Sequence, residues 1–313
     1  MPIELLKIAK FPPFVEKLLA DRFTLHDTTT TAADADALIE RVAPGVRGVV
    51  GLGVSKVPKN LLDRLPYVEI VATVGVGYDG VDLDACRSRG IVVANTPNVL
   101  NDDVADVALA LVLCSARRFV DGHNFVLAGE WLKAPMPLAS TLRGKTAGII
   151  GLGKIGKEIA KRLEACKLKI VYHGRSEQPG VGYSYFADLR AMAIESDFLV
   201  VACPGGKETV NLVDAGVLAA LGAEGTLVNI ARGSVVDEPA LITALQAGTI
   251  KAAALDVYAN EPKVPEALSA LKNVVLFPHL GSSTRETRLA MGQLTLANLN
   301  AHFDGEPLPA RVI

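Results

Sequence analysis

The sequence predicts an α/β protein with doubly wound parallel sheets, divided into two domains. Short apolar runs alternate with helical patterns along the chain. The runs are almost continuously apolar, which is typical of strands that are buried on both faces of a sheet. The chain has 313 residues, and at roughly 100–200 residues per domain this length suggests two domains.

The first part of the chain contains five apolar runs that we expect to be strands. They are IELLKIA (3–9), RFTLH (22–26), RGVVG (47–51), VEIVAT (68–73) and IVVAN (91–95). Helical patterns begin between them, near Pro13, Ala32, Pro58 and Asp82. Strands that alternate with helices predict a parallel sheet covered on both faces. A long helical pattern follows Pro97, and we expect residues 101–103 to cap its N-terminus.

The pattern restarts after the proline-rich loop KAPMPLAS (133–140). The expected strands are KTAGIIG (145–151), LKIVYH (168–173), FLVVAC (198–203), TLVNIA (226–231), AAALDV (252–257) and NVVLFP (273–278). A helical pattern at 154–166 follows the first of them, and a closing helix is expected at 285–303. We expect the second domain, residues 99–284, to be inserted into a first domain formed by residues 1–98 and 285–313. Hinges are expected near 95–98 and 281–284.

Composition excludes several classes of function. The net charge of −2 provides no basic field that would attract nucleic acid. The four cysteines stand singly, which argues against a disulfide framework or a metal site and suits a reducing compartment. The N-terminus lacks the pattern of a signal peptide, and the longest apolar run is too short to span a bilayer. We therefore expect a cytoplasmic protein without a membrane segment.

A glycine-rich stretch marks a phosphate-binding loop. Residues 151–156 read GLGKIG and lie between an expected strand and an expected helix. Gly151 permits the tight turn, Gly153 allows backbone to approach a pyrophosphate, and Gly156 lets the helix pack on the strand. The helix N-terminus offers N–H groups to the anion. The alternative is a tight turn without a ligand. The cofactor contacts expected here come from Gly151, Leu152, Gly153, Lys154, Ile155 and Gly156.

The end of the next strand bears on the choice of cofactor. A carboxylate that binds the adenosine ribose is expected about 20 residues after the glycine loop, but Gly174 occupies this place and Arg175 and Ser176 follow it. The change removes the repulsion of a 2′-phosphate, and the guanidinium and hydroxyl can bind that phosphate. The sequence thus favours NADP(H). Alternatively, Arg175 is a solvated surface residue and the protein uses NAD(H) through backbone contacts.

Three side chains with complementary chemistry stand near the ends of later strands. Arg232 can bind an α-carboxylate and polarise the adjacent carbonyl. His279 can deliver a proton near neutral pH, and Glu261 can hold its ring. Each also has a structural alternative: a cation at a helix end, a turn residue before Pro262, and a buried core histidine. Together with the glycine loop, they favour reduction of a 2-oxo acid by hydride transfer.

These motifs resemble one family in their order and spacing. GLGKIG (151–156), NIARGSVVDEPAL (229–241), ALDVYANEP (254–262) and PHLGSST (278–284), with the stretch at 71–98, look like D-isomer-specific 2-hydroxyacid dehydrogenases. The resemblance implies two Rossmann-like domains with a cleft between them, a flavodoxin-like substrate-binding domain and an NAD(P)-binding domain. It also implies a homodimer.

The resemblance assigns roles to further residues. It implies that Arg232, Glu261 and His279 are catalytic, with His279 as the acid and base. Further cofactor contacts would come from Cys203, Pro204, Ile230, Ala231, Arg232, Asp256, His279 and Gly281, with Asp256 at the nicotinamide carboxamide. Substrate contacts would come from Leu52, Gly53, Val74, Gly75, Val76, Gly77, Arg232 and His279. Trp131 either reaches the pocket of the partner subunit or packs in the dimer interface.

Within the family, the chain looks most like glyoxylate/hydroxypyruvate reductases, which commonly use NADPH. We therefore expect NADPH-dependent reduction of a small 2-oxo acid, glyoxylate or hydroxypyruvate, to the D-2-hydroxy acid. Two alternatives remain open. One is the same chemistry on a bulkier 2-oxo acid such as hydroxyphenylpyruvate. The other is a nucleotide-sensing, corepressor-like protein without catalysis, although the joint presence of Arg232, Glu261 and His279 speaks against it.

Overall fold

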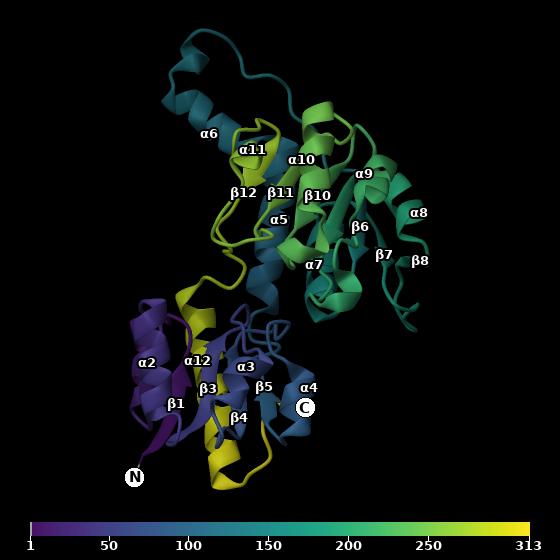
Figure 1. The fold of residues 1–313 in the computed structure, drawn as a ribbon. Coiled ribbons are helices and arrows are strands. Elements are labelled where there is room, and N and C mark those ends of the chain that lie inside the picture. The colour runs from purple at the N-terminus through teal and green to yellow at the C-terminus, as the bar shows by residue number, and fades with distance from the viewer. Residues whose placement is uncertain (1) are drawn as a thin grey trace. The chain divides into compact units, whose positions relative to one another are not determined.

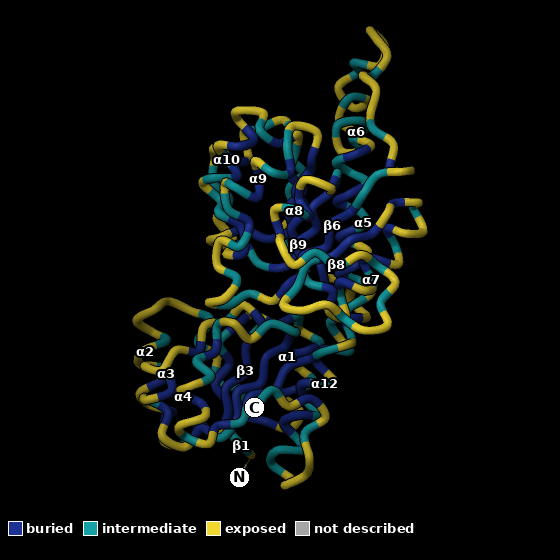
Figure 2. The backbone as a smooth tube through the Cα atoms, turned by 90° about the vertical axis from the view of Figure 1, so that its right-hand side faces the viewer, coloured by how far each residue is buried: buried dark blue, intermediate teal, exposed yellow. Residues whose placement is uncertain are grey.

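The chain forms two compact units, Met1–Leu100 with Ser283–Ile313 and Asn101–Ser282 (Figure 1). A computed structural model describes residues 2–313. Both units are α/β structures with a parallel sheet. In both, the central strands of the sheet are mostly buried, whereas exposed residues lie mostly in helices and turns (Figure 2). Across the described residues, no helix has the length and apolarity needed to cross a membrane.

The first unit contains a five-stranded parallel sheet with the order β2-β1-β3-β4-β5. Its elements are β1 (Ile3–Lys7), α1 (Pro13–Ala20), β2 (Phe23–Asp27), α2 (Ala32–Val42), β3 (Val46–Leu52), α3 (Lys59–Asp63), β4 (Ile70–Val74), α4 (Leu83–Ser88), β5 (Val92–Ala94) and α12 (Arg285–Asp304). Leu6 and Val49 face a core to which α2, α3 and α4 contribute. Leu5 and Val50, which point to the other face, are also fully buried. Both faces of this sheet are therefore covered.

The closing helix α12 belongs to the first unit, where it packs against α1 and β4. Thr284 caps it by accepting a hydrogen bond from the Thr287 amide at 3.2 Å. The buried Asn298 side chain donates to the Asn95 carbonyl at 3.1 Å and accepts from the Ala310 amide at 2.8 Å. Asn298 thus ties α12 to the end of β5 and to the C-terminal segment.

The second unit contains a seven-stranded parallel sheet with the order β12-β11-β10-β9-β6-β7-β8. Its strands are β6 (Thr146–Ile150), β7 (Lys169–His173), β8 (Ser184–Phe186), β9 (Phe198–Val201), β10 (Thr226–Asn229), β11 (Ala252–Leu255) and β12 (Val274–Leu276). Its helices are α5 (Asn101–Arg117), α6 (Phe119–Leu127), α7 (Lys154–Ala165), α8 (Leu189–Ile194), α9 (Ala215–Leu221), α10 (Glu238–Ala247) and α11 (Glu266–Ser269), with 3-10 turns η1 (Glu130–Leu132), η2 (Lys207–Thr209) and η3 (Gly233–Val235).

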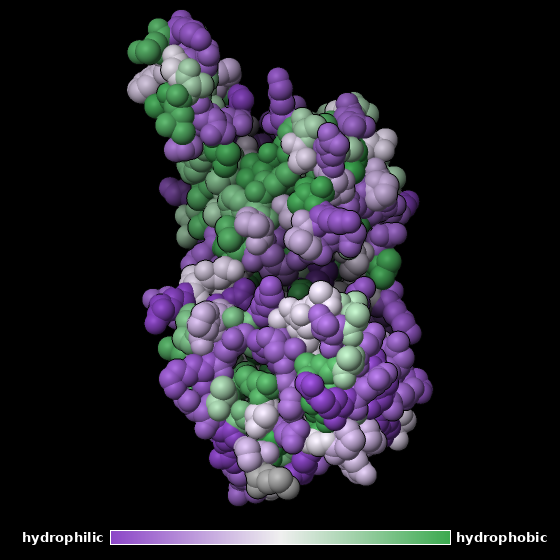
Figure 3. Space-filling view, turned by 60° about the vertical axis from the view of Figure 1, so that its left-hand side comes forward, coloured by the Kyte–Doolittle hydropathy of each residue, from purple (hydrophilic) through white to green (hydrophobic). Residues whose placement is uncertain are grey.

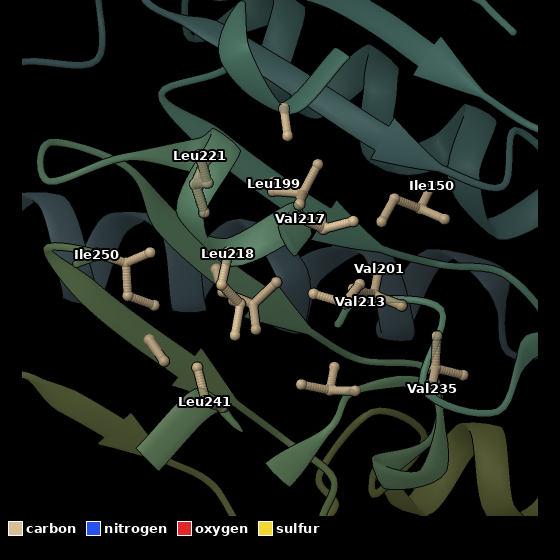
Figure 4. Close-up of a cluster of buried hydrophobic side chains, with 14 of the residues drawn as sticks. Ile150, Leu199, Val201, Val213, Val217, Leu218, Leu221, Val235, Leu241 and Ile250 are labelled. Carbon is tan, nitrogen blue, oxygen red and sulfur yellow. The ribbon is translucent and has the colours of Figure 1, made fainter. Parts of the chain in front are cut away.

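An apolar core joins the second sheet to its helices (Figure 4). Leu199, Val201 and Leu227 from the strands meet Leu218 and Leu241 from α9 and α10, and all five are buried. The strand order changes direction between β6 and β9, which makes this point a topological switch. In open α/β sheets, ligands bind at such a switch, outside the carboxyl ends of the strands.

Two details differ from the sequence-based expectation. The structure adds the edge strand β8, which has only three residues and pairs with β7; such a short run carries no clear pattern. Helix α5 begins at Asn101, so residues 101–103 form its first turn and do not precede it as caps. Asp102 and Asp103 stabilise this turn through the positive end of the helix dipole.

Candidate functional site

The residues singled out in the second unit follow six strands of one parallel sheet. They are the glycine loop after β6, Gly174 after β7, Cys203 after β9, Arg232 after β10, Asp256 after β11 and His279 after β12. Because every pair in this sheet is parallel, the carboxyl ends of the strands lie at one edge. The fold therefore gathers these groups along a single edge.

The glycine loop is tight because each of two glycines lacks a Cβ. Gly151 has a φ of +93°, and a Cβ there would lie 2.7 Å from the backbone of Cys203. A Cβ on Gly156 would lie 2.2 Å from the carbonyl oxygen of Gly151. These contacts bring the start of α7 against the end of β6, beside β9 and hence at the topological switch.

The same loop fits a dinucleotide pyrophosphate. Gly153 is the N-cap of the 12-residue helix α7, and it has no side chain that could bond the first N–H groups of the helix. No heavy atom lies within 4 Å of the position that a Cβ on Gly153 would take. The bare N-terminus and the open space above it are suited to an anion that approaches the backbone closely.

The loop after β7 lies beside the glycine loop. The Gln178 side chain donates to the backbone carbonyl of Leu152 at 2.8 Å. The backbone N–H of Gln178 donates to the Tyr172 hydroxyl at 2.8 Å. Arg175 and Ser176 are exposed on this loop, and nothing lies within 4 Å of a Cβ built on Gly174. The absent side chain at 174 therefore leaves space next to the guanidinium and the hydroxyl.

Glu261 and His279 form a hydrogen-bonded pair. Nδ1 of His279 lies 2.7 Å from Oε2 of Glu261, while Oε1 accepts from the Tyr258 amide at 3.1 Å. Partial burial alone would raise the pKa of Glu261, but the hydrogen bond and charge of His279 and the charge of Arg232 outweigh it and lower this pKa. Glu261 is therefore held as a carboxylate that fixes the imidazole ring.

Asp256 anchors the backbone that carries His279. Its two carboxylate oxygens accept from the amides of Leu280 at 2.6 Å and Gly281 at 2.9 Å, and its carbonyl accepts from the His279 amide at 2.9 Å. His279 adopts a φ of +55°, a conformation that costs free energy in a non-glycine residue and persists only where the surroundings hold it. Asp256 provides that support, and its predicted contact with the nicotinamide carboxamide stays a prediction.

Arg232 stands on a rigid turn next to the Glu261 loop. Asn229 clamps this turn, because its side chain donates to the Arg232 carbonyl at 2.9 Å and accepts from the Ala231 amide at 3.0 Å. A Cβ on Gly233 would lie 1.9 Å from the carbonyl carbon of Tyr258. Only glycine permits this approach, which places the turn after β10 against the loop that bears Glu261.

The remaining cofactor-side predictions also fall at this edge. Ile230 and Ala231 are buried between β10 and Arg232, and Cys203 is buried at the end of β9. Burial raises the pKa of the Cys203 thiol to about 11. The thiol is therefore protonated near neutral pH and packs as a small apolar group.

The predicted substrate residues of the first unit lie in two segments that pack against each other, at the ends of β3 and β4. A Cβ on Gly53 would lie 2.9 Å from the Gly77 carbonyl oxygen, so the segment after β3 packs closely on the segment after β4. Asn95 donates to the Val76 carbonyl at 2.8 Å, and the Thr96 amide donates to the Gly75 carbonyl at 2.9 Å. These bonds fix the backbone of residues 74–77. Trp131 belongs to η1 of the second unit, and 68% of its surface is exposed.

Three structural contacts were missed by sequence reasoning. Asn229 and Tyr258 lie inside the motifs NIARG and ALDVYANEP, but the motifs alone do not show that Asn229 clamps a turn or that Tyr258 bonds Glu261. The Tyr258 hydroxyl also donates to the Phe277 carbonyl at 2.9 Å, so it links two loops of the site. Gln178 stands two residues after Ser176, the last residue of GRS, and its polar side chain was the available signal.

The comparisons with known proteins agree with this architecture. The sequence model of the family described as D-isomer specific 2-hydroxyacid dehydrogenase, NAD binding domain, matches residues 109–281. The chain is 43% identical over 311 residues to hydroxyphenylpyruvate reductase of Plectranthus scutellarioides, with 99% of each chain covered. It is 44% identical over 311 residues to glyoxylate/hydroxypyruvate reductase A of Arabidopsis thaliana, again with 99% of each chain covered.

A solved structure shares the whole fold. It is the NADPH-dependent glyoxylate/hydroxypyruvate reductase of Sinorhizobium meliloti in complex with NADP and malonate. The TM-score is 0.91 at 42% identity, with 100% of this chain and 97% of that chain covered. The protein is thus an oxidoreductase with two Rossmann-like parallel-sheet domains. It belongs to the D-isomer-specific 2-hydroxyacid dehydrogenase family, which confirms the predicted fold class and resemblance.

Proposed function

We propose that this protein reduces a small 2-oxo acid, with glyoxylate and hydroxypyruvate as the leading substrates, to the D-2-hydroxy acid with NADPH. One observation carries the proposal: the His279–Glu261 pair, at 2.7 Å, stands at the same sheet edge as the glycine loop. A general acid and a site for a dinucleotide thus share one edge. The similarity to glyoxylate/hydroxypyruvate reductases supports the same substrate class.

Each residue of the site has a role in this proposal. NADPH, when bound at the glycine loop, supplies the hydride for the carbonyl carbon. Arg232 binds the substrate carboxylate together with the backbone N–H groups of residues 75–77. Glu261 holds Nδ1 of His279, which assigns Nε2 to protonate the carbonyl oxygen. Residues 1–98 with 285–313 serve as the substrate-binding domain and residues 99–284 as the dinucleotide-binding domain.

The preference for NADPH is attributed to Arg175 and Ser176. Both are exposed beside Gly174, on a loop that Gln178 holds against the glycine loop. The S. meliloti relative binds NADP, which supports the same preference here. The ratio of kcat/KM for NADPH to that for NADH should fall in Arg175→Ala. An unchanged ratio would remove Arg175 from the proposal and favour the reading in which NAD(H) is bound through backbone contacts.

The main test is the loss of NADPH absorbance when glyoxylate or hydroxypyruvate is added. His279→Ala should lower kcat by roughly 10²–10⁴-fold, the usual contribution of a general acid, while NADPH still binds. Near-normal turnover in this variant would eliminate His279 as the acid. NADPH binding without any reduction of 2-oxo acids would instead support the sensing, corepressor-like alternative.

A bulkier substrate is the second candidate. The hydroxyphenylpyruvate reductase of P. scutellarioides is 43% identical to this chain, close to the 44% of the Arabidopsis enzyme. Initial rates over a panel of 2-oxo acids should place hydroxypyruvate or glyoxylate above hydroxyphenylpyruvate in kcat/KM. The reverse order would assign the bulkier substrate.

We also propose a homodimer that uses the arm formed by α6 and the turns after it. None of the residues of α6 is buried, and apolar side chains gather on the arm (Figure 3). The exposed apolar residues of this segment are Phe119, Val120, Val126, Leu127, Trp131, Leu132 and Leu138. Such a patch is typical of a protein interface. Sedimentation velocity should show a dimer, and Leu132→Asp should shift it towards monomer, whereas a wild-type monomer would contradict the proposal.

A further inference from the structure

A cavity in the first unit carries positive charge that the proposed reaction has not used. It has a volume of about 410 Å³, within the roughly 300–1,000 Å³ range of small-molecule sites. Its lining residues are Lys10, Pro12, Phe14, Leu52, Ser283, Thr284, Arg285 and Arg288. This lining contains three cationic side chains and no carboxylate. The cavity is therefore suited to an anionic group.

The two guanidinium groups have partners other than carboxylates. Arg285 lies over the ring of Phe14, with its central carbon 5.0 Å from the ring centroid. Arg288 donates to the Ser283 hydroxyl at 3.2 Å. Burial lowers the pKa of Arg288 from its usual value, because no nearby carboxylate compensates for the lost hydration. Among the described residues, neither arginine forms an ion pair with a carboxylate.

Other arginines of the chain show the contrast. Arg47 binds Glu69 through two nitrogens at 2.6 and 2.9 Å. Arg162 binds Asp106 at 2.6 Å and Asp102 at 2.9 Å. A partly buried guanidinium is stabilised by an anionic partner. In the cavity, the partly buried Arg288 and the exposed Arg285 have no such partner among the described residues, which suits the site to an anionic ligand.

The cavity adjoins the proposed substrate site within the first unit. Leu52 belongs to both, and the next residue, Gly53, packs on the backbone of residues 75–77. The chain also links the cavity to the proposed acid, because Ser283 is four residues after His279. At about 3.6 Å per extended residue, four residues place the Cα of Ser283 at most ~14 Å from that of His279. This bound holds for any arrangement of the two units.

We propose that this cavity binds the far end of a 2-oxo acid that carries a second anionic group. Lys10, Arg285 and Arg288 would then determine specificity for dicarboxylic 2-oxo acids. The inference rests on the proposed function and names a substrate class for the same site. The carbonyl π bond breaks, its carbon accepts a hydride from NADPH, and its oxygen accepts a proton from His279. The products are the D-2-hydroxy dicarboxylate and NADP⁺.

An uncharged tail would use the cavity less well. Pro12, Phe14 and Leu52 offer apolar contacts, but an apolar tail would displace water from the guanidinium groups and provide no counter-charge. A terminal carboxylate of the same shape would accept charge-assisted hydrogen bonds from them. The charge of the tail, and not its bulk, should therefore govern selection.

The test compares two substrates that differ mainly in this charge. 2-Oxoglutarate carries a terminal carboxylate, and 5-methyl-2-oxohexanoate replaces it with an isopropyl group of similar shape. Wild-type protein should show a higher kcat/KM for 2-oxoglutarate. In Arg288→Gln and Arg285→Gln this preference should fall by roughly tenfold or more, because each variant removes a charged hydrogen-bond donor. The loss should appear mainly as a higher KM, because the tail of the substrate is bound equally tightly in the ground state and in the transition state.

Arg41→Gln is the matched control. Arg41 lies at the exposed end of α2 in the same unit, so its replacement removes one positive charge away from the cavity and should leave the substrate ratio unchanged. A wild-type preference for the uncharged isostere would overturn the inference. So would an unchanged ratio in the two cavity variants. If wild-type protein reduces glyoxylate with NADPH, either result refutes the specificity inference alone, whereas failure to reduce any 2-oxo acid refutes the proposed function.

Discussion

Replacing Gly153 with alanine should weaken NADPH binding without weakening the fold. Gly153 has φ −75° and ψ −162°, an extended conformation that alanine adopts readily. The new Cβ would meet no heavy atom within 4 Å. A glycine-to-alanine change at such a position stabilises a protein by about 0.4–1 kcal/mol, which corresponds to a rise in Tm of roughly 1–4 °C for a domain of 150–250 residues.

The methyl group would nevertheless stand where a pyrophosphate must approach the N-terminus of α7. The loss of charged hydrogen bonds from the backbone N–H groups costs roughly 1.5–3 kcal/mol, so the Kd for NADPH should rise about 10–150-fold. The distinguishing result is a rise in Tm together with a loss of affinity for NADPH. A loop that were only a tight turn would show the rise in Tm and no change in Kd.

Gly156→Ala provides the contrast within the same loop. Its Cβ would lie 2.2 Å from the carbonyl oxygen of Gly151, well inside the 3.4 Å at which ordinary contacts begin. Overpacking of this kind costs about 1–3 kcal/mol, so Tm should fall by roughly 2–12 °C, and affinity should fall with it. Thermal unfolding and a fluorescence titration with NADPH measure both quantities. If Gly153→Ala binds NADPH as wild type does, the reasoning about the phosphate loop is wrong.

Three more predictions follow from the site. Asp256→Asn should lower Tm and kcat more than Asp237→Asn, because an asparagine at 256 can accept from only one of the two backbone amides that Asp256 now bonds. Asp237 caps α10 through one oxygen, and asparagine caps a helix equally well. Equal losses in the two variants would contradict the anchoring role of Asp256. Cys203, with its pKa raised to about 11, should resist alkylation by iodoacetamide at pH 8, and rapid labelling seen by mass spectrometry would refute its burial. The pKa of Glu261 is lower in the folded protein than in the unfolded chain, so its ionisation stabilises the fold at pH values above the unfolded pKa of about 4.3. This stabilisation is lost as the pH falls through the folded pKa. The free energy of acid unfolding should therefore depend less on pH in this range in Glu261→Gln.

Much of the fold could be predicted because its strands are buried on both faces. In the second unit, β6, β9 and β10 read as apolar runs since helices cover both sides of the sheet, and periodicity reports burial directly. The edge strand β8 escaped prediction because three partly exposed residues carry no such signal. The start of α5 was misplaced by a turn, since asparagine and aspartate favour both the cap and the first turn of a helix.

Some features of the candidate site could likewise be predicted from the sequence, and others could not. Gly151 and Gly156 could be predicted because a tight turn between strand and helix demands glycine at this spacing, and Gly153 because a pyrophosphate must approach the backbone there. The grouping of Arg232, Glu261 and His279 was predicted from chemistry, and the structure brings Glu261 within 2.7 Å of His279. Sequence reasoning did not find that Asp256 bonds the backbone after His279, because that contact depends on how two loops meet after folding.

The division of the chain also orders its folding during synthesis. Residues 101–282 form one uninterrupted unit, so this segment has everything it needs to fold as soon as it leaves the ribosome. The first unit begins earlier but lacks α12 until residues 283–313 emerge, and Asn298 cannot bond Asn95 before then. The strands of the first unit therefore keep one apolar face uncovered until residues 283–313 have emerged. A nascent chain cut before residue 298 would contain a folded second unit and an incomplete first unit.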